Sequence, residues 1–181
     1  MNEAGFGDPR TCCSDAVLKD GTRISIRPVT ALDRDHLACL FQQLSPRSIY
    51  FRFFRHKQRL SDAELHLFTE LDFEKQAGLA VTIAGQDRII AVGRYTVVSD
   101  SDPLRAEVNF AVADAWQGRG IGSALLKHLA AVARGYGIES FEAFVLPGNV
   151  PMMAVFHHSG FPVSLAAEEG VIHVTFPILG G

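Results

Sequence analysis

Residues 112–126 read VADAWQGRGIGSALL, and this stretch decides the fold of the chain. The apolar end of a strand is followed by three glycines at alternate positions, Gly118, Gly120 and Gly122, and then by an amphipathic helix. Such glycines let successive backbone N–H groups point into one concavity, and the positive end of the helix dipole adds to them. The stretch therefore predicts a strand, an anion-binding turn and a helix, with a pyrophosphate as the natural ligand.

The segments around this stretch predict a single α/β domain with a mostly antiparallel middle. In residues 107–112, Val108, Phe110 and Val112 share one face, as in a half-buried strand, and residues 121–133 carry an apolar helical stripe. Further strands are predicted within 17–27 and over 78–84, 88–98, 140–146 and 171–178, and helices over 32–44, from 45, from 61 and over 151–158. Residues 1–16 are interpreted as a flexible leader and residues 17–181 as the domain.

Length and composition exclude several classes of protein. The 181 residues are close to one domain, and 48% hydrophobic residues supply an ample core. The net charge of −3 argues against a polybasic surface for nucleic acid or anionic lipid. The longest stretch without Asp, Glu, Lys or Arg, residues 143–167, is interrupted by prolines, and the first residues form no secretory signal. We therefore expect a soluble, cytoplasmic protein that needs neither membrane nor nucleic acid.

Cysteine and histidine give no sign of a metal site or of a disulfide framework. Cys12, Cys13 and Cys39 have no metal-ligand spacing, and none of the seven histidines stands in a ligand-like context. We expect free thiols and no metal.

Two common phosphate-binding motifs do not fit the glycine turn. A P-loop needs a lysine and a hydroxyl residue after its last glycine, but Gly122 is followed by Ser123 and Ala124. A dinucleotide-binding turn requires a glycine where Ser123 stands, and the alternating βαβ pattern is not visible.

Two motifs resemble the GNAT superfamily of N-acetyltransferases. Residues 117–122, QGRGIG, match its Q/R-x-x-G-x-G/A signature for the pyrophosphate of acetyl-CoA. Asn149, followed eleven and twelve residues later by Gly160 and Phe161, is similar to the second block of the superfamily. The resemblance covers roughly residues 23–178 and implies a mixed, mostly antiparallel, twisted sheet flanked by helices. Acetyl-CoA, the implied cosubstrate, would lie where two central strands splay apart.

Four further short stretches form a second pattern: residues 20–22 (DGT), 26–28 (IRP), 44–54 (LSPRSIYFRFF) and 106–108 (AEV). This narrower resemblance is to bacterial protein-lysine acetyltransferases of the Pat type. It implies acetyl transfer to a protein lysine, in a ternary complex. A small amine as acceptor and a non-catalytic acetyl-CoA sensor are the alternatives, and the oligomeric state is left open.

A general base is needed because a lysine amine, with a pKa of about 10.4, is almost wholly protonated at neutral pH. Glu107 is the candidate, since a carboxylate on the strand leading into the phosphate turn can accept that proton. It also falls where the resembling acetyltransferases place their base. Glu142 and Asp114 are weaker candidates, and Glu107 could instead be an ordinary surface residue of its strand.

The resemblance also implies the residues that bind the coenzyme. A backbone N–H near Val112 would face the developing oxyanion, and Asn149 would bind the pantetheine arm, although Asn149 could simply cap a helix. Phe156 replaces the tyrosine that serves many members as general acid. The full expected set is Val112, Gln117, Gly118, Arg119, Gly120, Ile121, Gly122, Ser123, Asn149 and Phe156.

Arginines gather in the first strand pair and the early helices. They suit an acidic protein surface and would repel a free polyamine. The arginines concerned are Arg23, Arg27, Arg34, Arg47, Arg52 and Arg55.

Overall fold

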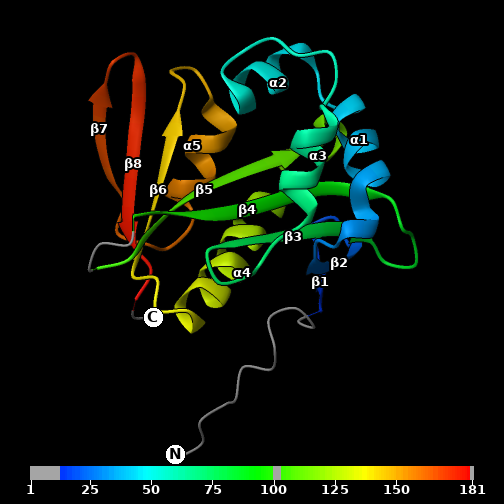
Figure 1. Ribbon diagram of the computed structural model, residues 1–181, viewed down its shortest axis with the longest axis horizontal. Helices are drawn as coiled ribbons and strands as arrows, with labels where there is room; N and C mark the ends of the chain where they lie inside the picture. The colour runs from blue at the N-terminus through cyan, green and yellow to red at the C-terminus, as the bar shows by residue number, and fades with distance from the viewer. Residues whose placement is uncertain (1–12, 100–102, 180–181) are drawn as a thin grey trace, which may run out of the picture.

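The computed structural model describes residues 13–99 and 103–179, which form one sheet with helices on both faces (Figure 1). The sheet has eight strands in the order β1-β2-β3-β4-β5-β6-β8-β7, and every neighbouring pair is antiparallel except β5 and β6. This confirms the expected mixed, mostly antiparallel α/β fold. The strands are β1 (Ser14–Val17), β2 (Arg23–Pro28), β3 (Gln76–Ile83), β4 (Ile89–Ser99), β5 (Arg105–Val112), β6 (Ser140–Val145), β7 (Ser164–Glu168) and β8 (Val171–Pro177). The helices are α1 (Arg34–Gln42), α2 (Pro46–Phe53), α3 (Asp62–Thr69), α4 (Ile121–Gly135) and α5 (Val150–His157), with short 3-10 turns η2 (Ala31–Asp33) and η3 (Asp114–Trp116).

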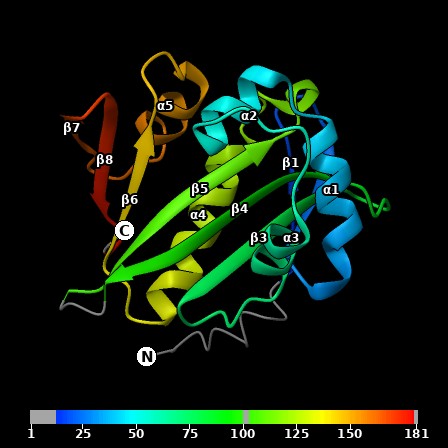
Figure 2. The ribbon, with the colours of Figure 1, turned by 45° about the horizontal axis from the view of Figure 1, so that its top comes forward.

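The core lies between the sheet and α4. The apolar stripe predicted for α4 is buried, with Leu125, Leu126 and Leu129 all at 0% exposure. Helices α1 and α3 cover the opposite face of the sheet (Figures 1 and 2). The interior of β3 is therefore buried on both faces, which explains its nearly continuous apolar sequence.

The sheet splits between β5 and β6. These parallel strands pair only at Arg105–Ser140, Ala106–Phe141 and Glu107–Glu142, and beyond these pairs they diverge (Figure 2). Strand β5 continues beside β4 to Val112, while β6 continues beside β8. The split leaves an opening in the middle of the sheet that begins at Glu107.

A buried ion pair joins β2 to the start of the early helices. Asp33, only 3% exposed, accepts hydrogen bonds from Arg27 at 2.8 and 2.7 Å and from the backbone N–H of Thr30 at 2.8 Å. Burial raises the pKa of Asp33, but the Arg27 and Thr30 hydrogen bonds outweigh it and hold the pKa at about 2. The Ile26-Arg27-Pro28 motif thus has a structural role here.

Two details differ from the expectation. Ser14 to Ala16, expected in the leader, belong to β1, because their backbone pairs with β2 at the sheet edge. Residues 1–12 of the expected leader, Cys12 among them, lie outside the described residues. Strand β7 was not expected: all five of its residues are exposed at the other sheet edge, so no apolar alternation marks it.

Two further findings concern the described part of the chain. Its helices include none long and apolar enough to cross a bilayer. Cys13 and Cys39 are exposed and free. The expected cytoplasmic location stays a prediction.

Candidate active site

A cleft of about 1300 Å³ opens at the split in the sheet. Its walls come from the diverging halves of β5 and β6, the start of α4, helices α2 and α5, and the β1–β2 hairpin. Glu107 and all of the residues expected to bind the coenzyme line this one cleft: Val112, Gln117, Gly118, Arg119, Gly120, Ile121, Gly122, Ser123, Asn149 and Phe156. The structure therefore brings together residues that are up to 49 positions apart in the sequence (107 to 156).

The start of α4 is open toward the cleft. Gly118 and Gly120 have φ values of +73° and +89°, which side chains rarely adopt, and an added Cβ at either would meet no atom within 4 Å. Gly120 is the N-cap of α4, and no side chain caps this helix. The N–H groups of the first turn are thus free to bind an anion.

Gly122 has a different role from the other two glycines. A Cβ at Gly122 would lie 2.7 Å from Val155 Cγ2, so this glycine allows α4 and α5 to pack closely. The spacing of the motif therefore combines backbone conformation at Gly118 and Gly120 with close packing at Gly122.

The polar side chains of the glycine turn bind other parts of the protein. Gln117 Nε2 donates to the carbonyl oxygen of Val112 at 3.1 Å and to Ser48 Oγ at 3.2 Å. Arg119 forms an ion pair with Asp20 of the β1–β2 turn, with 2.7 Å between Nη1 and Oδ2, and lies over the Trp116 ring. These side chains fix the turn, while its backbone faces the cleft.

Glu107 lies half-buried at the point where β5 and β6 separate. Two guanidinium groups stand on the same side of the sheet: Arg94 on β4 and Arg52 on α2, whose Nη2 donates to Asn109 Oδ1 at 2.6 Å. Burial and then the Arg94 charge lower the pKa of Arg52, the Glu107 carboxylate opposes both, and the resulting pKa is about 10. Glu107 therefore sits in the field of two cations that sequence reasoning did not place there.

The two alternative bases are engaged elsewhere. Asp114 Oδ1 accepts from the backbone N–H of Ser45 at 3.1 Å; burial raises the pKa of Asp114, but hydrogen bonds from Ser45 and Ser48 outweigh it and hold the pKa low. Glu142 accepts from Arg105 at 3.2 Å, contacts His173 at 3.1 Å and is not among the residues that line the cleft. The geometry favours Glu107 over both.

Asn149 and Phe156 form the α5 side of the cleft. Asn149 Oδ1 accepts from the backbone N–H of Met152 at 3.2 Å, so this side chain caps α5, as its alternative interpretation held. Phe156 is 1% exposed, and its ring centroid lies 5.6 Å from that of Phe176. A buried phenyl ring offers no proton to a leaving group.

Sequence reasoning missed the β1–β2 hairpin as a wall of the site. Val17 and Lys19 line the cleft, and Ser14 hydroxyl lies 3.1 Å from His128 Nε2 on α4. The resemblance in residues 20–22 was the available signal, because Asp20 of this turn pairs with Arg119 of the glycine turn. No group of three or more His, Cys, Asp or Glu side chains that could hold a metal occurs in residues 13–99 and 103–179.

Comparison with known proteins agrees with this geometry. The Acetyltransferase (GNAT) family matches residues 44–161, more than half of the chain. The chain is 29% identical to Acetyltransferase PA5475 of Pseudomonas aeruginosa over 146 residues, which cover 80% of this chain and 77% of that protein. It is also 29% identical to Acetyltransferase Pat of Mycolicibacterium smegmatis over 155 residues, 86% of this chain but only 46% of that protein.

Among solved structures, the GNAT domain of S. lividans PAT superposes with a TM-score of 0.84 and 43% identity, over 91% of this chain and 96% of that one. A cAMP-binding acyltransferase from Mycobacterium smegmatis superposes with a TM-score of 0.66 and 25% identity, over 93% of this chain and 48% of that one. The chain thus spans about half the length of Acetyltransferase Pat of Mycolicibacterium smegmatis and of the cAMP-binding acyltransferase. Its fold, its glycine turn at the split sheet and these matches together show that the chain belongs to the acetyltransferase (GNAT) family.

Proposed function

We propose that the protein transfers the acetyl group of acetyl-CoA to the side-chain amine of a protein lysine, in a ternary complex, with Glu107 as general base. One observation carries the proposal: a single cleft contains Glu107 at the split of the sheet and, beside it, the uncapped start of α4. The first supplies a proton acceptor, and the second supplies a site for the pyrophosphate of the coenzyme.

The proposed reaction needs no covalent enzyme intermediate. The neutral amine attacks the thioester carbonyl carbon, the C–N bond forms, and the C–S bond breaks. The amine proton passes to the Glu107 carboxylate, directly or through a water molecule. A backbone N–H near Val112 would stabilise the oxyanion that develops on the thioester carbonyl.

The leaving group departs without an assigned acid. Phe156 has no proton to give, but a thiol with a pKa of about 8.5 leaves tolerably as the thiolate and then takes a proton from solvent. We therefore expect proton removal by Glu107, and not proton donation, to dominate the pH dependence of the rate.

A protein acceptor is supported by the surface beside the cleft. Residues 44–54, which resemble the Pat type, form α2 and its flanks at the cleft wall. Arg47 lines the cleft and lies over the Phe51 ring, and Tyr50 and Phe54 are 40% and 42% exposed. Arginine and exposed aromatic side chains are typical of protein interfaces. The likeness to the GNAT domain of S. lividans PAT points the same way.

Mass spectrometry with isotopically labelled acetyl-CoA tests the proposal. Labelled acetyl-lysine should appear on acidic protein substrates with a much higher kcat/KM than on spermidine or free lysine, and added salt should reduce the difference. A higher rate on the small amines, insensitive to salt, would assign the protein to the small-molecule class.

The Glu107→Gln variant tests the base. Turnover should fall by roughly 10²–10⁴-fold while acetyl-CoA still binds, because the amide keeps the size but accepts no proton. Glu74→Gln, a change at an exposed residue outside the cleft, is the matched control. Normal turnover in Glu107→Gln would show that the carboxylate is structural, and a wild-type protein that binds acetyl-CoA but acetylates no amine would be a sensor.

A further inference from the structure

A small side chamber of about 40 Å³ adjoins the cleft at Asn109, two residues along β5 from Glu107. Leu44, Arg52, Phe53, Asn109 and Ala111 line both the chamber and the cleft. The chamber reaches from there to Arg94 on β4, and its other walls are apolar side chains and Gly78. By this measure one water molecule needs roughly 10–15 Å³, so the chamber has room for about two to four waters or for one carboxylate group.

The two cations of the chamber have only neutral hydrogen-bond partners. Arg94 Nη2 donates to Gln76 Oε1 at 2.8 Å and to Thr96 Oγ1 at 3.2 Å, and Arg52 donates to the Asn109 amide oxygen. Within the described residues, neither guanidinium lies within ion-pair distance of a carboxylate; Glu107 acts on both only through its longer-range field.

One donor of Arg94 has no partner at all. Its Nε is buried and makes no hydrogen bond, which is rare for a buried polar atom and calls for a reason. Burial also lowers the pKa of Arg94. Burying a cation without a counter-ion is costly. A guanidinium with a spare donor is suited to a carboxylate, which here would accept from the unpartnered Arg94 Nε and lie in the field of Arg52.

We propose that this chamber binds a carboxylate carried by one of the two reactants. The carboxylate would belong either to the acyl chain of the coenzyme thioester, as in a short dicarboxylic acyl group, or to an acidic residue next to the acceptor lysine. This proposal rests on the proposed function, because that function places the thioester and the acceptor amine beside Glu107. It adds a selectivity to the proposed acetyl transfer: a preference for an acyl donor or an acceptor that carries a carboxylate.

The chemistry of transfer is the same for an acidic donor. The amine nitrogen forms the C–N bond, the C–S bond breaks, the amine proton goes to Glu107, and CoA leaves as the thiolate. The distal carboxylate takes no part in bond formation and only positions the acyl chain at Arg52 and Arg94.

Titration calorimetry without acceptor tests the donor as the source. Succinyl-CoA and butyryl-CoA have acyl chains of four carbons and differ in the charged end. The wild-type protein should bind succinyl-CoA at least about tenfold more tightly, and Arg94→Gln should remove that preference. Arg94→Lys keeps the charge but removes the spare Nε donor and should retain part of the preference. Arg134→Gln, at an exposed arginine in the last turn of α4, should leave the preference unchanged.

Peptide assays with acetyl-CoA test the acceptor as the source. A peptide with Glu beside its lysine should be used with at least about tenfold higher kcat/KM than the same peptide with Gln there, and Arg94→Gln should again remove the difference. A preference in either experiment that depends on Arg94 supports the chamber and identifies the source. A wild-type protein with no preference in both experiments overturns it, and so does a preference that survives Arg94→Gln, with folding confirmed by thermal melting.

The two experiments separate this proposal from the proposed function. Binding of succinyl-CoA is measured without catalysis, so an Arg94-dependent preference would stand even if no amine were acetylated. Acetylation of lysine with no charge preference at either reactant would support the proposed function and overturn the carboxylate site.

Discussion

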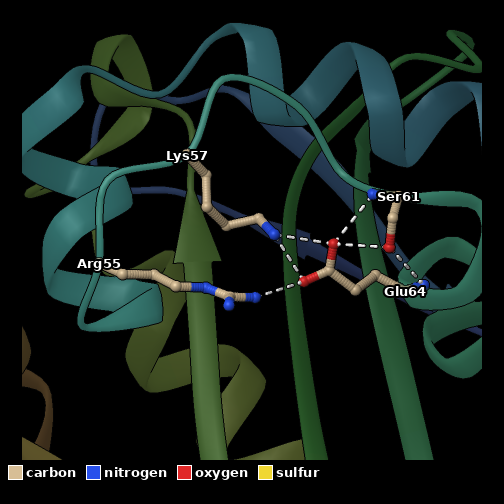
Figure 3. Close-up of polar contacts among 4 residues, drawn as sticks. All are labelled: Arg55, Lys57, Ser61 and Glu64. Carbon is tan, nitrogen blue, oxygen red and sulfur yellow. Dashed lines mark hydrogen bonds and ion pairs between the residues drawn. The ribbon is translucent and has the colours of Figure 1, made fainter.

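The starts of α3 and α4 are opposite solutions to the same problem, the unpaired N–H groups of a first helical turn. At α3, Ser61 Oγ accepts from the N–H of Glu64 at 3.2 Å, and Glu64 Oε2 accepts from the N–H of Ser61 at 2.9 Å (Figure 3). Lys57 Nζ adds contacts of 2.7 and 2.8 Å to the same carboxylate, and Arg55 adds one of 3.2 Å. At α4 the corresponding position is Gly120, and no side chain caps the helix.

The difference shows which helix start serves the fold and which serves a ligand. The closed start of α3 satisfies its own donors, and it stabilises the protein without any partner. The open start of α4 leaves its donors to an anion, and the nearby Gln117 and Arg119 side chains bind other groups instead of closing it. A helix start left bare beside a cleft is thus informative about function, whereas a capped one is informative about stability.

The largest effect is expected from closing the α4 start with Gly120→Asp. Aspartate is a favoured N-cap residue, but here its carboxylate would occupy the place of the pyrophosphate. Acetyl-CoA affinity should fall by a hundredfold or more, about 2.8 kcal/mol, in titration calorimetry. An unchanged affinity in a folded variant would show that the coenzyme does not use this turn.

Alanine variants separate charge from strain in that experiment. Gly120→Ala adds a Cβ at φ +89° without a charge and should cost stability of about 1 kcal/mol, with a smaller loss of affinity than Gly120→Asp. Gly122→Ala should lower the melting temperature, because its Cβ meets Val155.

The next effect is a pH-dependent loss of stability in Glu64→Gln. Burial raises the pKa of Glu64, but hydrogen bonds from Lys57 and Ser61 outweigh it and lower the pKa from 4.5 to about 2. Because the folded pKa is depressed, this stabilisation is complete above pH 4.5 and disappears as the pH falls toward 2. At pH 7 the variant should lose on the order of 2 kcal/mol of unfolding free energy.

Urea unfolding of both proteins between pH 7 and pH 3 measures this effect. The gap between wild type and variant should narrow at the acid end, although both also lose the contribution of Asp33, whose pKa is about 2. A gap that stays constant with pH would show that the Glu64 charge does not matter.

A smaller effect is expected from removing the cap itself in Ser61→Ala. The loss of the Ser61 hydroxyl leaves the Glu64 N–H without its acceptor and should cost about 1 kcal/mol. Acetyl-CoA affinity should not change, because no residue of α3 lines the cleft. A loss of acetyl-CoA affinity in Ser61→Ala would contradict the inference that the start of α3 serves stability alone.

The smallest effect is expected from Arg55→Gln. The Arg55 side chain is 64% exposed, whereas that of Lys57 is 11% exposed and contacts both carboxylate oxygens. Exposed ion pairs contribute little, so Arg55→Gln should change the unfolding free energy by less than about 0.5 kcal/mol, and Lys57→Gln should change it more. A larger loss of unfolding free energy in Arg55→Gln than in Lys57→Gln would contradict the inference that Lys57 is the main partner of the Glu64 carboxylate.

Patterns local in sequence predicted most of the fold and the geometry of the glycine turn. The glycine turn, the α4 stripe and the Ser61 capping signal depend on residues a few positions apart, and the structure confirms all three. Strand β7 was not predicted, because its residues are all exposed and only their pairing with β8 defines the strand.

The rest of the site depends on contacts that no local pattern encodes. The field around Glu107 comes from Arg52 on α2 and Arg94 on β4, which are 42 positions apart (52 to 94) and have no common motif. The engagement of Gln117 with Ser48 depends likewise on a helix 69 positions earlier. The spacing of the motif predicted which residues would meet at the glycine turn. It did not predict which of their side chains would be hydrogen-bonded to other parts of the protein.

The hairpin at the beginning of the domain has a consequence for folding kinetics. Asp20 contacts Arg119 across 99 positions, and Ser14 contacts His128 across 114. Contacts of such high sequence separation form late, because the intervening chain must first be ordered. We therefore expect the glycine turn to be completed after the rate-limiting step of folding. We expect bound acetyl-CoA to slow unfolding in stopped-flow experiments and to leave the folding rate unchanged, since a ligand that needs this turn stabilises only what lies beyond the transition state.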